Sequence, residues 1–133
     1  MLKKNGLVIG LTLAAATFAI TPSMADQSMP SSIKMVEAMN TQILADGHGM
    51  SLYTFDKDKM NVSNCNGDCA VKWPPLMAKS DAKGMGDYSV IKRADGSMQW
   101  ANKGMPLYTW FKDKKQGDTT GDGVKGVWHI AKP

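Results

Sequence analysis

Two cysteines separated by three residues form the most chemically distinctive pair in this chain. Cys65 and Cys69 are its only cysteines, and Asn66-Gly67 between them supplies a turn. On an α-helix, residues four apart hold their Cβ atoms about 5–6 Å apart, whereas a disulfide needs about 3.5–4.5 Å. A bond between them therefore requires a loop. In an oxidising compartment the pair predicts a structural disulfide that pins the segment around Trp73.

The same cysteine pair has two alternative interpretations, a soft-metal site and a thiol–disulfide redox centre. Thiolate and thioether sulfur favour Cu(I), so copper is the metal that this pattern suggests. His48, Met50 and His129 are the further ligands available to Cys65 and Cys69. Against copper, the methionines are dispersed along the chain, and methionine also fills gaps in protein cores.

A calcium site is a weaker interpretation of the aspartates in residues 117–123. Asp118 and Asp122 lie four apart in a glycine-rich stretch, like the start of a calcium loop. Position twelve counted from Asp118 is His129, where such a loop needs a bidentate Glu. The segment therefore predicts a turn-rich loop with solvated carboxylates.

Signatures of common enzymes and of nucleic-acid binding are missing from the sequence. It has no phosphate-cradling Gly-rich loop, no His-Glu-x-x-His helix and no Gly-x-Ser-x-Gly elbow. Its two histidines lack a neighbouring nucleophile motif. Basic and acidic residues alternate instead of forming a basic stripe. These features predict a non-enzymatic protein that does not bind nucleic acid.

The chain contains an internal repeat with an offset of 55 residues. Residues 49–59 align with residues 104–114, and 8 of these 11 positions are identical. The same offset places Trp73 on Trp128 without a gap, while Cys65 and Cys69 align with Thr120 and Val124. Two copies are too few for a solenoid, so the repeat predicts one pseudo-symmetric domain.

Each repeat carries a Tyr-x4-Asp pattern, with an aromatic residue two positions after the tyrosine. A buried tyrosine needs a partner for its hydroxyl group, so we expect the phenol to bond across the end of a hairpin. Because active sites in small domains are rarely duplicated, we interpret these residues and the paired tryptophans as structural anchors. The anchors are Tyr53, Phe55, Asp58, Trp73, Tyr108, Trp110, Asp113 and Trp128.

Short β-prone runs separated by turn residues predict the elements that position these side chains. Residues 41–46 and 50–55 flank Asp46-Gly47-His48-Gly49 and predict a hairpin. In the second repeat, residues 88–92, 98–101 and 106–111 predict strands, and residues 126–131 predict a last one. Residues 52–55 have large side chains on both faces, so we expect other parts of the protein to pack against both sides of that strand. Residues 31–44 are compatible with a helix or a strand.

The first 25 residues predict a cleaved export signal. Lys3 and Lys4 precede an apolar stretch, residues 7–20, and a small-residue site ends at Ala25. Removing them leaves 14 basic and 12 acidic residues, a charge of +2 on 108 residues. No other apolar run approaches the ~20 residues that span a bilayer. The expected location is the periplasm or the medium.

Several segments together resemble a bacterial family of secreted repeats, often described as predicted lipoproteins with a Tyr-x-(Phe/Trp/Tyr)-x-x-Asp motif. The resemblance runs from about residue 43 to residue 130 and rests on residues 52–58, 63–70, 73–76, 104–108 and 117–129. It implies a secreted or lipid-anchored repeat of unknown function. No cysteine stands at the cleavage site to accept lipid, which argues against anchoring here.

We therefore expect a small, mainly β single domain of two pseudo-symmetric hairpin-based repeats with short helical or irregular segments. The expected organisation is a signal peptide at 1–25, an N-terminal segment at 26–40, and one domain at 41–133 with repeats at about 41–79 and 96–133. The expected function is a non-enzymatic binding or structural role in the cell envelope, with an envelope protein or a small ligand as partner.

Overall fold

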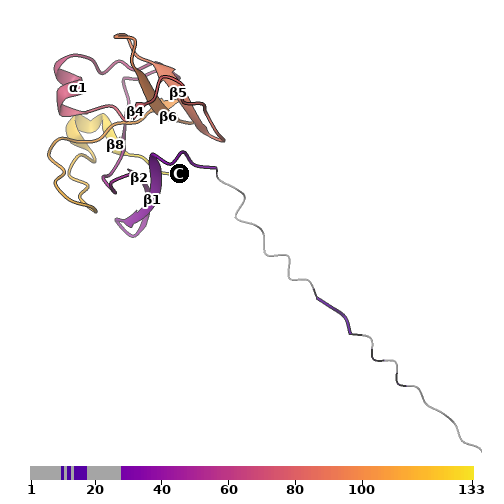
Figure 1. The fold of residues 1–133 in the computed structure, drawn as a ribbon. Helices are drawn as coiled ribbons and strands as arrows, with labels where there is room; N and C mark the ends of the chain where they lie inside the picture. Colours follow the sequence, from indigo (N-terminus) through magenta and orange to yellow (C-terminus); the bar gives the residue numbers. More distant parts are fainter. Residues whose placement is uncertain (1–9, 11, 13, 18–27) are drawn as a thin grey trace, which may run out of the picture.

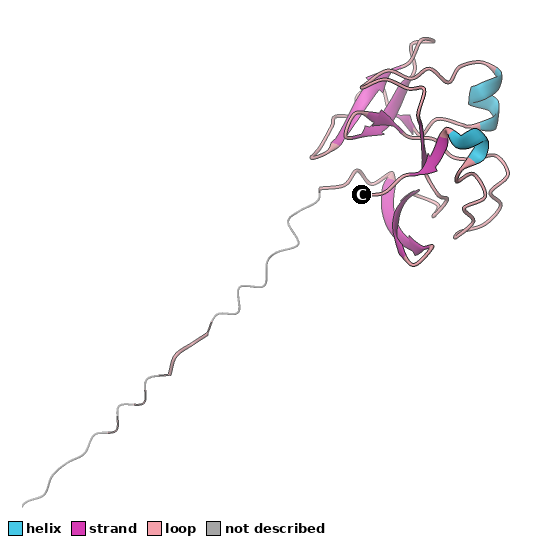
Figure 2. Cartoon of the chain, turned by 180° about the vertical axis from the view of Figure 1, so that it is seen from behind, coloured by secondary structure: helices cyan, strands magenta, loops and turns pink. Residues whose placement is uncertain are grey.

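A computed structural model describes residues 10, 12, 14–17 and 28–133. Over these residues the fold is mainly β, as predicted, with two short helical segments on one side (Figures 1 and 2). In chain order the elements are β1 Ile33–Ala38, β2 Thr41–Asp46, β3 Tyr53–Phe55, α1 Asp68–Lys72, β4 Met77–Ala78, β5 Tyr88–Lys92, β6 Met98–Asn102, β7 Met105–Pro106, η1 Val124–Gly126 and β8 Trp128–Ile130.

Most of the predicted export signal, including the cleavage site near Ala25, lies outside the described residues. Within the part of the chain that the structure does describe, no helix has the length and apolar character needed to cross a bilayer.

The first hairpin resolves the ambiguity of residues 31–44, which form strands. β1 pairs with β2 in an antiparallel register that runs from Ile33 opposite Asp46 to Ala38 opposite Thr41. Met39 and Asn40 connect them with φ values of 55° and 60°. Two successive residues at positive φ are typical of a type I′ turn, whose twist matches that of the flanking strands.

The second hairpin is the counterpart of the first and forms a larger sheet. β5 pairs with β6 along one edge, while β4 and β7 pair with different parts of β6 along the other. The strands predicted at 88–92 and 98–101 are therefore present. The run predicted at 106–111 is a regular strand only at its start and continues through isolated bridges at Tyr108.

The hairpin predicted over 41–55 forms only in part. Ser51 bridges Ala45, and Leu52 donates a backbone hydrogen bond to Leu44 over 3.0 Å. From Tyr53 onward the chain leaves β2 and pairs as β3 with β8, the last strand of the second repeat. Strand pairing with the other repeat therefore takes the place of the second half of the predicted hairpin.

The two repeats are interlocked around the two motif tyrosines. Tyr53 and Tyr108 exchange backbone hydrogen bonds of 2.8 and 3.0 Å. β3 pairs with β8, and in the same way Tyr108 bridges Pro75 of the first repeat. Each repeat thus completes the strand pairing of the other.

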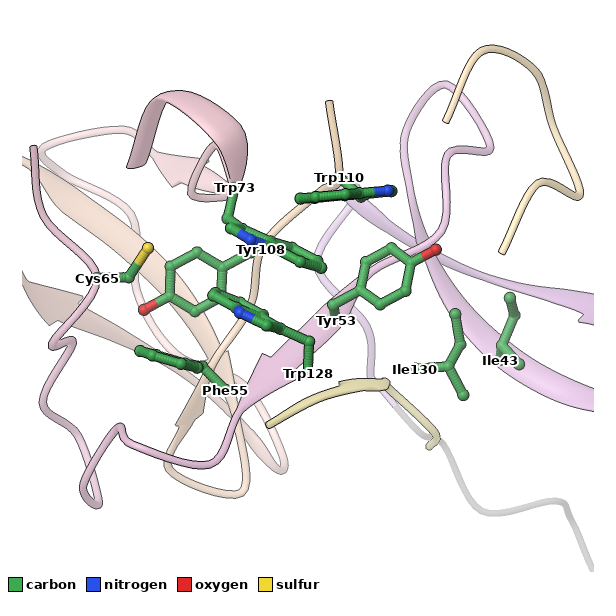
Figure 3. Packing of buried hydrophobic residues seen from close by; sticks show 9 residues of the cluster. All are labelled: Ile43, Tyr53, Phe55, Cys65, Trp73, Tyr108, Trp110, Trp128 and Ile130. Carbon is green, nitrogen blue, oxygen red and sulfur yellow. The ribbon is translucent and has the colours of Figure 1, made fainter. Parts of the chain in front are cut away.

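Two clusters of buried side chains lie on opposite faces of the segment around β3. Leu52 belongs to one cluster, while Tyr53 and Phe55 belong to the other, which confirms that this strand is covered on both sides. The first cluster, called here the aromatic core, comprises Ile43, Tyr53, Phe55, Cys65, Trp73, Tyr108, Trp110, Trp128 and Ile130 (Figure 3). The second comprises Ile33, Leu44, Leu52, Tyr88, Trp100, Leu107 and Ala131.

Two glycines at equivalent positions of the repeats show how closely the copies pack. Gly49 and Gly104 have φ values of +83° and +82°, a region that favours glycine. A Cβ atom on Gly49 would lie 2.6 Å from the Gln116 side chain, and one on Gly104 would overlap the sulfur of Met60. Each glycine therefore admits a side chain from the other repeat.

Candidate functional site

The motif tyrosines bond to aspartates of the opposite repeat. The Tyr53 hydroxyl donates to Asp113 over 2.6 Å, and the Tyr108 hydroxyl donates to Asp58 over 2.6 Å. The phenols therefore bond between the repeats and not across the end of a hairpin in their own repeat, which corrects the expectation from the sequence. The interlocked strands bring each tyrosine next to the aspartate of the other copy.

The environment of both pairs favours a structural role. Burial, followed by the hydrogen bond to the carboxylate, raises the pKa of Tyr53 and of Tyr108 far above the ordinary value, so both phenols stay neutral. Burial also raises the pKa of Asp58, against hydrogen bonds from the Asn64 amide and Tyr108. Asp113 accepts two further hydrogen bonds from Thr120, at 3.0 and 2.6 Å.

A buried arginine, which sequence reasoning missed, ties the second hairpin to the first repeat. Arg93 is only 6% exposed. Its guanidinium donates to Ser63 Oγ over 2.9 Å, to Gln99 over 2.8 Å and to the Cys65 carbonyl oxygen over 2.7 Å. Ser63 in turn bonds to the Tyr108 hydroxyl. The feature of the sequence that sets Arg93 apart is that it is the only arginine in the chain.

Four aromatic rings form a continuous column through the aromatic core. Trp73 and Trp128 stack in parallel with ring centroids 3.7 Å apart. Phe55 stacks on the outer face of Trp128 at 4.2 Å, and Trp110 covers the outer face of Trp73 at 3.9 Å. Figure 3 shows the four rings one above another, and the pattern follows the repeat because Phe55 is equivalent to Trp110 and Trp73 to Trp128.

The two tyrosines pack against this column with their rings nearly perpendicular to the indoles, on opposite sides of it (Figure 3). Tyr108 meets Trp128 at 5.2 Å and Tyr53 meets Trp73 at 5.4 Å. Gly121 leaves room for this packing, since a Cβ atom there would lie 2.9–3.0 Å from the rings of Tyr53, Trp73 and Trp110.

Cys65 and Cys69 form the predicted disulfide, with Cα atoms 5.2 Å apart. Cys65 lies in the loop before α1, and Cys69 lies in the first turn of that helix. The loop required by Cβ geometry is therefore present. The disulfide holds the start of α1 against the aromatic core, because Cys65 is fully buried there and Cys69 packs beside it.

The residues suggested for copper do not assemble a metal centre in the described part of the chain. There, no group of three or more His, Cys, Asp or Glu side chains is placed to hold an ion. Cys65 and Cys69 are bonded to each other. His129, on β8, lies 2.8 Å from the carboxylate of Asp56. His48 and Met50 lie at the turn after β2, where their backbone amides donate to Asp46.

The aspartates of residues 117–123 are engaged with the backbone. Asp118 accepts hydrogen bonds from the amides of Lys114 and Lys115 at 2.8 and 3.1 Å, and the Lys114 bond is the main reason why its pKa lies below the ordinary value. Asp122 accepts from the amide of Ile130 at 2.9 Å. The hydrogen bonds to these carboxylates stabilise the loop that precedes β8.

An open groove of about 420 Å³ runs along the aromatic column where the two repeats meet. Its walls include α1 of the first repeat and η1 of the second, which lie side by side in Figures 1 and 2. These elements are equivalent in the repeat, because Cys69 aligns with Val124. The four rings of the column line the groove together with Phe111, which is 43% exposed.

Lysines surround this aromatic lining. Four lysines and one acidic residue, Asp68, belong to the walls, which gives the groove a surplus of positive charge. Sequence reasoning missed these lysines because they are scattered along the chain. One signal was present, since Lys57 and Lys112 are equivalent in the repeat. The four are Lys57, Lys72, Lys112 and Lys125.

Comparison with known proteins identifies a family for the chain. A protein-family model described as a secreted repeat of unknown function matches the chain twice, over residues 34–77 and 89–132. The two matches have the same 55-residue offset as the internal repeat, and they include β1 and β5 respectively. No curated protein and no solved structure shows significant similarity to the chain.

Proposed function

The chain belongs to the family of secreted repeats of unknown function, and we propose that it is a non-enzymatic module of the cell envelope that binds a small ligand in the groove between its repeats. Its expected location is the periplasm or the medium, after cleavage of the export signal near Ala25. The family description as a secreted repeat supports export.

The observation that carries this proposal is the groove along the aromatic column. Its volume of about 420 Å³ is in the range of small-molecule sites, which are concave, largely apolar and rich in aromatic side chains. Its floor is preformed, because stacking and the disulfide fix the rings and α1. Since a rigid site loses little conformational entropy on binding, this floor suits a ligand site.

The chemistry of the surrounding groups supports binding rather than catalysis. The two phenols are neutral and bonded to carboxylates, and the sulfur atoms form a disulfide. The groups that line the groove are aromatic rings, aliphatic side chains, ammonium groups, the disulfide and the carboxylate of Asp68, which are contact groups for a ligand.

A screen of small fragments by ligand-observed NMR tests this function. We expect hits that compete with one another for one site and that weaken about tenfold in Phe111→Ala, because an exposed aromatic wall contributes on the order of 1 kcal/mol of contact. Val71→Ala is the matched control, since Val71 is 72% exposed, lies on α1 and does not line the groove. Hits that bind Phe111→Ala as tightly as wild type would contradict the proposal.

A further inference from the structure

The two central tryptophans of the column present only their edges to the groove. Trp73 has Trp110 on one face and Trp128 on the other, and Trp128 has Trp73 on one face and Phe55 on the other. Both residues nevertheless line the groove. With both faces covered, the surfaces available to a ligand are the ring edges.

Ring edges carry the positive part of the aromatic quadrupole. A ligand against Trp73 and Trp128 therefore meets a weakly positive surface that is still apolar. An aromatic ligand that lays its negative face on these edges makes the favourable edge-to-face contact. Tyr53 and Tyr108 already form T-shaped pairs with the same rings, at interplanar angles of 76° and 89°.

The charged side chains of the groove also favour a ligand that carries negative charge. Lys57 and Lys112 approach from equivalent positions of the two repeats, while Lys72 comes from α1 and Lys125 from η1. Asp68 is the one acidic residue among the lining side chains. A ligand with a negative group therefore gains charge complementarity in the groove.

The row of aromatic ring edges also favours a planar ligand. Four rings with centroid separations of 4.2, 3.7 and 3.9 Å form a floor long enough for a fused two-ring system. We propose that the ligand of this groove is a planar aromatic anion, bound face-on to the indole edges with its acidic group toward the lysines. This inference rests on the proposed function of the groove.

Calorimetric titration with four probes separates shape from charge. The probes are 2-naphthoate, the neutral 2-naphthalenemethanol, the cationic 2-naphthylmethylammonium, and octanoate, an anion without a flat ring. We expect 2-naphthoate to bind about tenfold more tightly than the neutral alcohol at low salt, with the cation weakest, because each ammonium group attracts the anion. Raising the salt to about 0.5 M should reduce this preference, and octanoate should bind more weakly than 2-naphthoate.

Two double variants locate the charge effect. Lys57→Gln with Lys112→Gln removes two groove lysines, and Lys59→Gln with Lys114→Gln removes the same charge from equivalent positions outside the groove. The first should abolish the preference for 2-naphthoate over the alcohol, whereas the second should retain it.

The outcomes distinguish this inference from the proposed function. If the alcohol binds as tightly as 2-naphthoate in the groove, the anion preference is wrong while the binding function stands. If octanoate equals 2-naphthoate, the requirement for a planar ring is wrong. If no probe binds and the fragment screen also gives no groove-dependent hit, both proposals fail.

Discussion

At the scale of residues, the motif shared by the two repeats forms two equivalent hydrogen bonds between them. Tyr53 bonds to Asp113 and Tyr108 bonds to Asp58, so the same four side chains join the repeats twice. Both hydroxyls are buried, and hydrogen bonds to a charged group in such a setting contribute more than neutral ones. The motif therefore stabilises the junction that forms the groove.

A double-mutant cycle tests this reciprocal arrangement. Tyr53→Phe and Asp113→Asn should show a coupling of about 1–2 kcal/mol in the free energy of unfolding, because both act on the same hydrogen bond, the first by removing its donor and the second by replacing its charged acceptor with a neutral amide. Tyr53→Phe and Asp58→Asn should be nearly additive. Denaturant unfolding of the single and double variants measures both couplings, and a larger coupling for Tyr53 with Asp58 would contradict the arrangement.

Tyr88→Phe is the control for the cycle. Tyr88 is 4% exposed, and its hydroxyl takes part in none of the hydrogen bonds found among the described residues. Its replacement should therefore change stability by less than about 0.5 kcal/mol. A cost equal to that of Tyr53→Phe would show that the motif hydroxyls contribute no special stabilisation.

Sequence reasoning found these residues but did not identify which aspartate bonds to which tyrosine, for a physical reason. The internal repeat shows that Tyr53 and Tyr108 occupy equivalent positions. A hydrogen bond to the aspartate of the same repeat and one to the aspartate of the other repeat fit this sequence pattern equally well. Only the path of the chain after Leu52, where it leaves β2 for β8, decides between them. Arg93 was missed because being the only arginine of the chain does not reveal that its side chain is buried.

At the scale of elements, exchange of strands makes the domain indivisible. β3 of the first repeat needs β8 of the second, and Tyr108 of the second repeat needs Pro75 of the first. An isolated repeat would therefore expose unpaired strand edges and half of the aromatic column. The repeats are duplicated in sequence, but they do not form two separate units in the structure.

Separate expression of residues 26–86 and 87–133 tests this statement. Each half alone should lack the near-ultraviolet circular dichroism of packed tryptophans, because stacking of Trp73 on Trp128 joins the two halves. Mixing equimolar halves should restore the signal. A half that folds as a monomer with that signal would contradict the interlocked arrangement.

The sequence predicted most strands but left residues 31–44 open. Their apolar spacing suits a helix as well as a strand, and the deciding feature is the two-residue turn at Met39 and Asn40. Methionine at positive φ is not an expected turn residue, so the usual turn signals did not reveal it. The disulfide was predictable because Cys65 and Cys69 are the only cysteines of a chain expected in an oxidising compartment, and Cβ geometry added that the bond requires a loop.

At the scale of the whole molecule, the junction between the repeats is the candidate site. Duplication makes the junction nearly symmetric, with Phe55 and Trp110 at the two ends of one column and Lys57 and Lys112 beside it. The sequence could predict the duplication and the secreted family. It could not predict the groove, because its lining comes from segments far apart in the chain.

The tryptophan side chains themselves offer the most direct test of the central claim, that the groove between the repeats binds a ligand. Protein labelled with ¹⁵N at the indoles should give one signal for each of its four tryptophans. On titration with 2-naphthoate, the signals of Trp73, Trp110 and Trp128 should shift together, because these residues line the groove. Trp100, buried in the other cluster, should not shift. A shift of Trp100 alone, or saturable binding that leaves the three groove signals unchanged, would contradict the claim.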